Sequence, residues 1–141
     1  MMPYIWVMIG SALGGVLRYA VSKATIPLSH GFPVGTMLIN IVGSFVIGYF
    51  GTLTLHTGRY PASENLRLFV MVGVCGGFTT FSSFSLQTFD LIRDGDWGRA
   101  LLNVTLSVVL CLGAVAAGHA LAYQTTHEQA IAETAEEEYT G

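Results

Sequence analysis

Charged residues are absent from four long stretches of the chain, and this pattern predicts the first structural elements. The stretches without Lys, Arg, Asp or Glu are residues 1–17, 24–58, 68–89 and 100–127. Because a helix needs about 20 mostly apolar residues to cross a bilayer, we predict four transmembrane helices, near residues 3–23, 34–56, 67–92 and 98–123. The links between them are short and rich in turn-forming residues: "IPLSHGFP", "HTGRYPASEN" and "RDGDWG". The predicted fold class is an all-α membrane protein.

The composition agrees with a membrane protein and leaves no stretch for a soluble domain. Of the 141 residues, 52% are hydrophobic and 11% are charged, a balance typical of membrane proteins. A very hydrophobic soluble bundle is the alternative, but its helices would show a polar face that these stretches lack. No Lys or Arg precedes the first apolar run, so we interpret it as a helix and not as a cleaved signal. We therefore predict a transmembrane domain over residues 1–123 and an acidic, disordered tail over residues 124–141.

Positive charges are nearly balanced between the two sides of the predicted membrane domain. Arg59 and Arg67 belong to the side of the termini, whereas the other side has Lys23, Arg93 and Arg99. This weak bias leaves two alternatives open: a marginal preference for one orientation, or insertion in both orientations with head-to-tail pairing. Four helices of this length can hardly enclose a polar pathway alone, which favours a homodimer.

Small residues on the first two predicted helices indicate close packing. Gly10 and Gly14 stand in a GxxxG spacing, and the second helix has a side formed by Gly43, Ser44, Gly48 and Gly51. Helices with such faces can approach closely in a membrane. Glycines that face lipid are the alternative interpretation.

The stretch "GVCGGFTTFSSFS", residues 73–85, interrupts the third apolar run with glycines and hydroxyl residues. Glycine is a poor helix former, and Ser and Thr side chains compete for backbone groups. We therefore predict a break in the third helix at Gly76 and Gly77. Irregular backbone persists at membrane depth only where it is buried or lines a wet cavity. The carbonyl groups released by the break would need a partner, and a bound ion is one candidate.

Downstream of these glycines, aromatic and hydroxyl side chains follow separate stripes. Every third residue is phenylalanine at 78, 81 and 84, and every third residue is a hydroxyl at Thr79, Ser82 and Ser85, while Thr80, Ser83 and Gln87 follow a helical spacing. A ladder of rings would thus lie beside a ladder of hydroxyls. The alternative is that the rings face lipid and the hydroxyls bond back to their own helix, and spacing alone does not decide between the two.

Buried amides and hydroxyls without carboxylates favour an anion as the ligand of the membrane interior. Asn40 stands in the apolar stretch "MLINIVGSF", and Asn103 and Ser107 lie one turn apart on the fourth helix. Polar residues at membrane depth usually face the interior or a pathway, with helix–helix contact as the alternative for Asn40. The only acid near a span is Asp90, at the end of the third helix. A cation-coupled exporter would need an intramembrane carboxylate, whereas N–H and O–H donors and the positive edges of aromatic rings suit a small anion.

Other classes of function have little support in the sequence. The histidines lie mostly in loops or the tail, without Asp or Cys at a catalytic spacing. Cys75 and Cys111 form neither a metal-binding motif nor a disulfide framework. We therefore do not expect an enzyme, and the main alternative to an anion channel is a small antiparallel multidrug-type cation transporter.

Four motifs together resemble a known family: "LGGVLRY", "GTMLINIVGS", "GVCGGFTTFSSFS" and "GRALLNVTLS", one in each predicted helix. They are similar to the small bacterial fluoride channel family, often called Fluc or CrcB, over roughly residues 4–122. The resemblance implies an antiparallel dual-topology homodimer with two pores and passive export of cytoplasmic fluoride across the inner membrane, which reduces fluoride toxicity. The implied partners are the fluoride ion, membrane lipid and a second copy of the chain, and no nucleic acid is expected.

The resemblance also implies roles for individual residues. A structural sodium ion at the dimer centre would be held by the backbone carbonyls of Gly76 and Thr79 from each subunit. The implied fluoride pore contains Asn40, Phe81, Phe84, Thr80, Ser83 and Ser107, with Arg18 near the vestibule. The sequence departs from the family pattern at three places: Gln87 replaces a glutamate of many members, Asn103 replaces a tyrosine, and the acidic tail beyond Tyr123 is longer than the family pattern.

Overall fold

The computed structural model describes residues 2–55, 58 and 60–140, and it describes side chains as far as residue 126. Every element among these residues is helical. In chain order they are α1 (Met2–Ala24), the short 3₁₀ helix η1 (Ile26–Leu28), α2 (Val34–Leu53), α3 (Glu64–Arg67), the π-helix η2 (Leu68–Cys75), α4 (Gly76–Phe78), α5 (Phe81–Arg93) and α6 (Trp97–Thr140). The predicted all-α fold class is confirmed.

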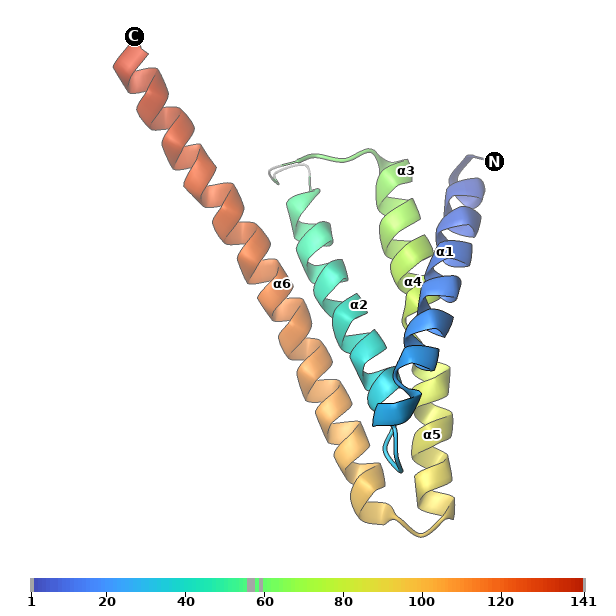
Figure 1. Cartoon of the computed structure of the whole chain (residues 1–141). Coiled ribbons are helices and arrows are strands. Elements are labelled where there is room, and N and C mark those ends of the chain that lie inside the picture. The colour runs from blue at the N-terminus through green and yellow to red at the C-terminus, as the bar shows by residue number, and fades with distance from the viewer. Residues whose placement is uncertain (1, 56–57, 59, 141) are drawn as a thin grey trace.

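Four segments are long and apolar enough to cross a membrane, judged by length and composition. They are Met2–Ala24, Val34–Leu53, Glu64–Arg93 and Trp97–Thr126, so the predicted number and order of the spans are confirmed. The start of α1 and the loop between α2 and α3 lie at one end of the molecule, and the α1–α2 and α5–α6 loops lie at the other (Figure 1). This arrangement is the one expected of a multi-pass membrane protein.

Positively charged residues lie at both ends of the membrane-spanning segments. Arg67 in α3 lies at the end opposite to Lys23, at the end of α1, and to Arg93, at the end of α5. Arg59 lies outside the described residues. Helix α6 runs to Thr140 and so passes residue 123, where we expected it to end; the disorder expected of the acidic segment stays a prediction.

The third segment changes its winding twice before it reaches α5. From Leu68 to Cys75 it is a π-helix, a rare and wider form than the α-helix. Gly76 and Gly77, where we expected the break, are helical. The backbone leaves the helix two residues later, because Thr79 has ψ 158° and Thr80 has ψ 108°, both in the extended region.

Glycines let the helices approach one another at two crossings. A methyl group at Gly10 of α1 would lie 2.9 Å from Cα of Gly73 in η2, closer than non-bonded carbon atoms come. At the second crossing, a methyl group at Gly118 of α6 would lie 2.7 Å from the backbone nitrogen of Tyr49 in α2. The close packing predicted from the GxxxG spacing in the first helix is therefore confirmed.

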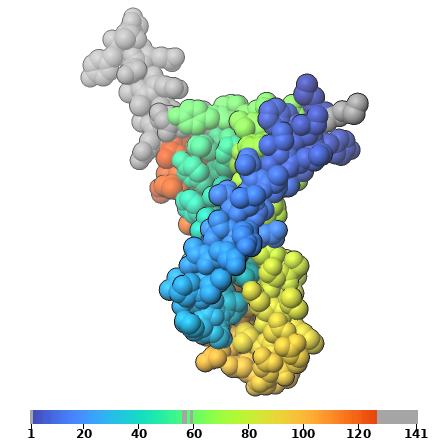
Figure 2. All heavy atoms as spheres, turned by 45° about the vertical axis from the view of Figure 1, so that its right-hand side comes forward, coloured from blue at the N-terminus to red at the C-terminus, as the bar shows by residue number. Residues whose placement is uncertain are grey.

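Large apolar side chains cover the outside of the molecule. Exposed Leu, Val, Ile and aromatic residues extend along α1 and α6, and few apolar side chains other than Ile39 are fully buried. Figure 2 shows α1 crossing one face diagonally over α3 and η2, with α5 and the start of α6 forming the opposite end. An apolar exterior of this extent is what lipid or a second membrane subunit would cover.

Candidate functional site

The candidate site lies where the third segment leaves the helix and passes α2. Thr80 N–H donates to Asn40 Oδ1 at 2.8 Å, and Asn40 Nδ2 donates to the Thr80 carbonyl at 3.2 Å. The side-chain amide of Asn40 therefore pairs with Thr80 as a neighbouring strand would, and it satisfies backbone groups that have left the helix. Gly43, one turn further along α2, makes the approach possible, because a methyl group there would overlap Cγ2 of Thr79.

The hydroxyl of Thr80 starts helix α5 and connects two serines. It accepts a hydrogen bond from Ser83 N–H at 3.2 Å, which satisfies one of the free N–H groups in the first turn of the helix. It also donates to Ser83 Oγ at 3.0 Å and lies 3.2 Å from Ser82 Oγ. This N-cap explains why the chain returns to a helix at Phe81.

The interruption diverts two N–H groups away from carbonyl oxygens. In a continuous α-helix, Thr80 N–H would bond to the carbonyl of Gly76, and Ser83 N–H would bond to the carbonyl of Thr79. Here the first donates to Asn40 and the second to the Thr80 hydroxyl. The carbonyls of Gly76 and Thr79, which the family resemblance implies as sodium ligands, are therefore among the carbonyls that lose a helical donor at the interruption.

Most hydroxyl hydrogens in this region are already used within the chain. Three hydroxyls donate to the carbonyl four residues earlier: Thr79, Ser85 and Thr88. Since Thr80 gives its hydrogen to Ser83, Ser82 must donate to Thr80. Within the described residues, Ser83 is the one hydroxyl of the series 79–88 whose hydrogen has no acceptor. Bonding back to the helix, the alternative that spacing left open, thus applies to part of the ladder only.

Two phenylalanine rings of α5 stand beside this polar group. The ring centroids of Phe81 and Phe84 lie 5.4 Å apart, with planes inclined at 44°. The Phe81 side chain is 78% exposed, and it shares an open groove of about 280 Å³ with Asn40 and Thr79. The other residues that line this groove are Gly43, Ser44, Ile47 and Cys111. None of the described residues covers one side of the groove, so the ring of Phe81 is accessible from that side.

Ser107 is held in a separate set of contacts, between α6 and α5. Its hydroxyl donates to Asn103 Oδ1 at 3.4 Å, and Asn103 Nδ2 donates to Thr88 Oγ1 at 2.8 Å. The sequence interpretation missed Thr88, although it continues the every-third hydroxyl series of Thr79, Ser82 and Ser85. The signal available was the amide of Asn103 in an apolar helix, since a buried amide needs a partner on a neighbouring helix.

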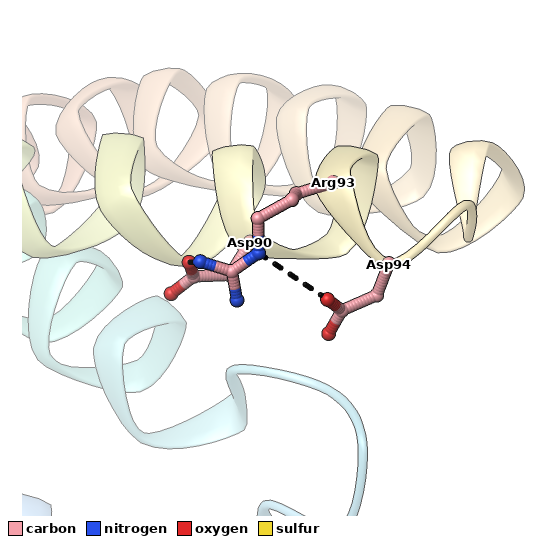
Figure 3. Close-up of polar contacts among 3 residues, drawn as sticks. All are labelled: Asp90, Arg93 and Asp94. Carbon is pink, nitrogen blue, oxygen red and sulfur yellow. Dashed lines mark hydrogen bonds and ion pairs between the residues drawn. The ribbon is translucent and has the colours of Figure 1, made fainter.

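A second polar region lies at the end of the molecule where α1, α2 and α5 meet. A cavity of about 420 Å³ is lined there by hydroxyl residues of α1, of α2 and of the segment between them, together with Gln87, Asp90 and Asp94 of the α5 region. Arg93 forms ion pairs with Asp90 at 3.1 Å and with Asp94 at 3.4 Å (Figure 3). The positive charge of Arg93 therefore compensates two acids at this end.

Arg18, the residue expected near a vestibule, does not line the cavity itself. It lies on α1 one turn before Ser22, which does line the cavity. Among the described residues, Arg18 has no hydrogen bond or ion pair. The guanidinium is therefore not committed to a partner within this described part of the chain, and its role stays a prediction.

Comparison with known proteins connects this geometry to a family. The chain matches the family described as CrcB-like protein, Camphor Resistance (CrcB), over residues 5–119. It is 63% identical over 134 residues to a protein of Gluconobacter oxydans (strain 621H), an alignment that covers 94% of this chain and 93% of the relative. A protein of Methylobacterium radiotolerans is 64% identical over 118 residues, covering 84% of this chain and 82% of the relative. Both relatives carry the name fluoride-specific ion channel FluC.

Proposed function

The chain belongs to the CrcB-like family, and from this membership we propose that it is a fluoride-specific ion channel. It would export cytoplasmic fluoride passively across the bacterial inner membrane. Fluoride enters cells from acidic surroundings as neutral HF, ionises in the cytoplasm and is trapped there. A passive pore lets the anion leave down its own gradient, and so it lowers the toxicity of fluoride without an energy source.

The observation that carries the proposal is the hydroxyl chain from Ser82 through Thr80 to Ser83. Each hydroxyl donates to the next, so the bonds polarise one another. The chain ends in the free hydrogen of Ser83, which can donate to an anion without breaking an existing bond. Such a donor replaces part of the hydration shell that a small anion must lose to enter a membrane.

The rings of Phe81 and Phe84 supply the second element of the proposed pathway. The edge of an aromatic ring carries partial positive charge, so it attracts an anion more weakly than a fixed guanidinium would. Weak attraction suits conduction, because an ion that binds too tightly does not leave. Within the described part of the spans, no carboxylate lies beside these rings to repel the anion.

We propose further that two chains assemble as an antiparallel dimer with dual topology. The open groove beside Asn40 and the exposed ring of Phe81 support this, since one chain covers only one side of the candidate pathway. The nearly balanced positive charges at the two ends of the molecule agree with insertion in both orientations. In such a dimer the two broken third segments would meet near the two-fold axis.

A sodium ion at that axis is the proposed structural cofactor. Within the described residues, no three His, Cys, Asp or Glu side chains gather as a metal site, so a cation there would use backbone oxygens. The carbonyls of Gly76 and Thr79 have lost their helical donors, and carbonyl oxygens suit a hard cation. Two such carbonyls from each subunit would form a symmetric set of four ligands. The bound charge would favour anions nearby.

Fluoride efflux from liposomes tests the proposed function. Purified protein is reconstituted into vesicles loaded with potassium fluoride or potassium chloride, and release is followed with ion-selective electrodes after valinomycin is added. We expect release of fluoride and retention of chloride, because the donors are few and closely spaced. Equal release of both anions, or release of neither, would contradict the assignment.

A further inference from the structure

The amide of Asn103 occupies an unusual position for a polar group in a membrane helix. It is 1% exposed and is one of the two largest side chains that are fully buried. An amide left unpaired at such a place would cost about 1–3 kcal/mol.

Three consecutive hydrogen bonds pass through Asn103 and connect α6 to the backbone of α5. Ser107 Oγ donates to Asn103 Oδ1, and Asn103 Nδ2 donates to Thr88 Oγ1. Thr88 Oγ1 in turn donates to the carbonyl of Phe84 at 2.7 Å. All donors point in the same direction along this chain of bonds, so each bond strengthens the next.

Helix α5 needs such an attachment because apolar packing holds it weakly. None of the 13 residues from Phe81 to Arg93 is buried in the chain. Apolar contact is also non-directional, so it does not fix how far a helix is rotated about its axis. Hydrogen bonds are directional, and the bond from Thr88 ends on the carbonyl of Phe84.

We propose that Asn103 is a positioning residue that sets the rotation of α5, and with it the direction of the Phe84 and Phe81 rings. An amide fits the requirement, because the side chain must accept from Ser107 and donate to Thr88 at once, and an amide has a separate oxygen and nitrogen for the two bonds. Leucine could do neither, and an ionised aspartate could only accept. The inference rests on the proposed function for its transport readout.

The experiment uses the full chain with three substitutions. Asn103→Leu removes both bonds at similar side-chain volume, and Thr88→Val removes the next hydroxyl isosterically. Thr105→Val is the matched control, because Thr105 is exposed on the same helix and has no side-chain hydrogen bond among the described residues. Fluoride efflux should fall about tenfold in the first two variants and stay within twofold in the control. In the Asn103→Leu, Thr88→Val double variant, the loss should not exceed that of the stronger single variant, since both changes break one chain of bonds.

A second readout separates this inference from the proposed function. 4-Fluorophenylalanine placed at position 84 reports the surroundings of that ring by fluorine NMR, whether or not the protein transports fluoride. We expect its signal to shift in Asn103→Leu and Thr88→Val and to stay unchanged in Thr105→Val. An unchanged signal, multiplicative losses in the double variant, or loss of the dimer in size-exclusion chromatography would overturn the positioning role. Absence of fluoride efflux from the unmodified protein alongside the expected NMR shifts would overturn the channel assignment only.

Discussion

The contact between Asn40 and Thr80 shows how one polar side chain in a membrane helix can both hold a neighbouring segment in place and offer a donor to a ligand. Both hydrogen-bonding groups of the Asn40 amide contact the backbone of Thr80. The amide nitrogen carries a second hydrogen that these bonds do not use. Helix–helix contact and a place in the pore, which the sequence left as alternatives, are therefore compatible for this residue.

The phenylalanine rings lead to a residue-scale prediction. Phe81→Ile or Phe84→Ile keeps apolar bulk but removes the ring edge, so the barrier to the anion should rise. Each increase of about 1.4 kcal/mol slows passage tenfold, and we expect fluoride efflux to fall by at least that factor while the dimer persists. Phe89→Ile is the control, because Phe89 is exposed on the same helix outside the ladder. Normal efflux in both variants would mean that the rings only contact lipid.

At the scale of residues, the sequence predicted which side chains form the candidate site better than it predicted their hydrogen-bond partners. The amides, hydroxyls and rings of the candidate site stand out because each is exceptional in an apolar run. Their hydrogen-bond partners could not be predicted. Asn40 bonds to a backbone group 40 residues away in the sequence, and only the packing of α2 against the third segment brings the two together. Thr88 was overlooked for the same reason, because its importance comes from Asn103 on another helix.

At the scale of helices, the packing of α1 on η2 depends on the absence of side chains at the crossing. Gly10→Ala should lower the stability of the protein by about 1–3 kcal/mol, because the added methyl group would overlap backbone atoms that cannot move aside. Gly15→Ala is the matched control on the same helix, since nothing lies within 4 Å of a methyl group there. It should be neutral or slightly stabilising, given the higher helix propensity of alanine. Thermal unfolding in detergent measures the stability of the two variants, and equal melting temperatures would contradict the close contact between α1 and η2.

The position of the interruption shows where helix propensity stops being informative. Glycine propensity placed the break at Gly76 and Gly77, yet both are helical. Gly77 packs its bare backbone against Ser11 of α1, where a methyl group would lie 2.9 Å from Cα. The contact with α1 thus explains why residue 77 is a glycine. The position of the break is set instead by the N-cap at Thr80 and by the hydrogen bonds from Asn40 to Thr80. The π-helical winding of η2 had no signal in the sequence that we can identify.

At the scale of the whole molecule, the open space beside Gly76 provides a test for the proposed second subunit. Among the described residues, the nearest atom to a methyl group at Gly76 would be the carbonyl oxygen of Met71, at 4.0 Å. A single chain therefore tolerates a larger residue there, whereas a partner or an ion held between partners would not.

The corresponding prediction compares two variants at the proposed sodium ligands. Gly76→Val should abolish fluoride efflux and weaken the dimer, because the side chain would enter the space between subunits. Thr79→Ser keeps the backbone and the hydroxyl, and it should retain efflux within about twofold, since the loss of one methyl group alters no backbone ligand. Efflux and the dimer fraction in size-exclusion chromatography measure both effects. A Gly76→Val protein that stays dimeric and conducts normally would show that no partner packs against this glycine.

The pairing of Asn40 with Thr80 also constrains how the protein can be made. During synthesis α2 leaves the ribosome before the third segment, so its amide reaches the membrane before Thr80 is there to pair with it. Lipid offers neither donor nor acceptor, so the amide must remain near the headgroups or in the insertion machinery until the third segment arrives. The unwound residues Thr79 and Thr80 face the same difficulty, because they cannot satisfy themselves as a helix does. The second and third segments therefore have to leave the insertion machinery as a pair, joined by the loop of residues 54–63.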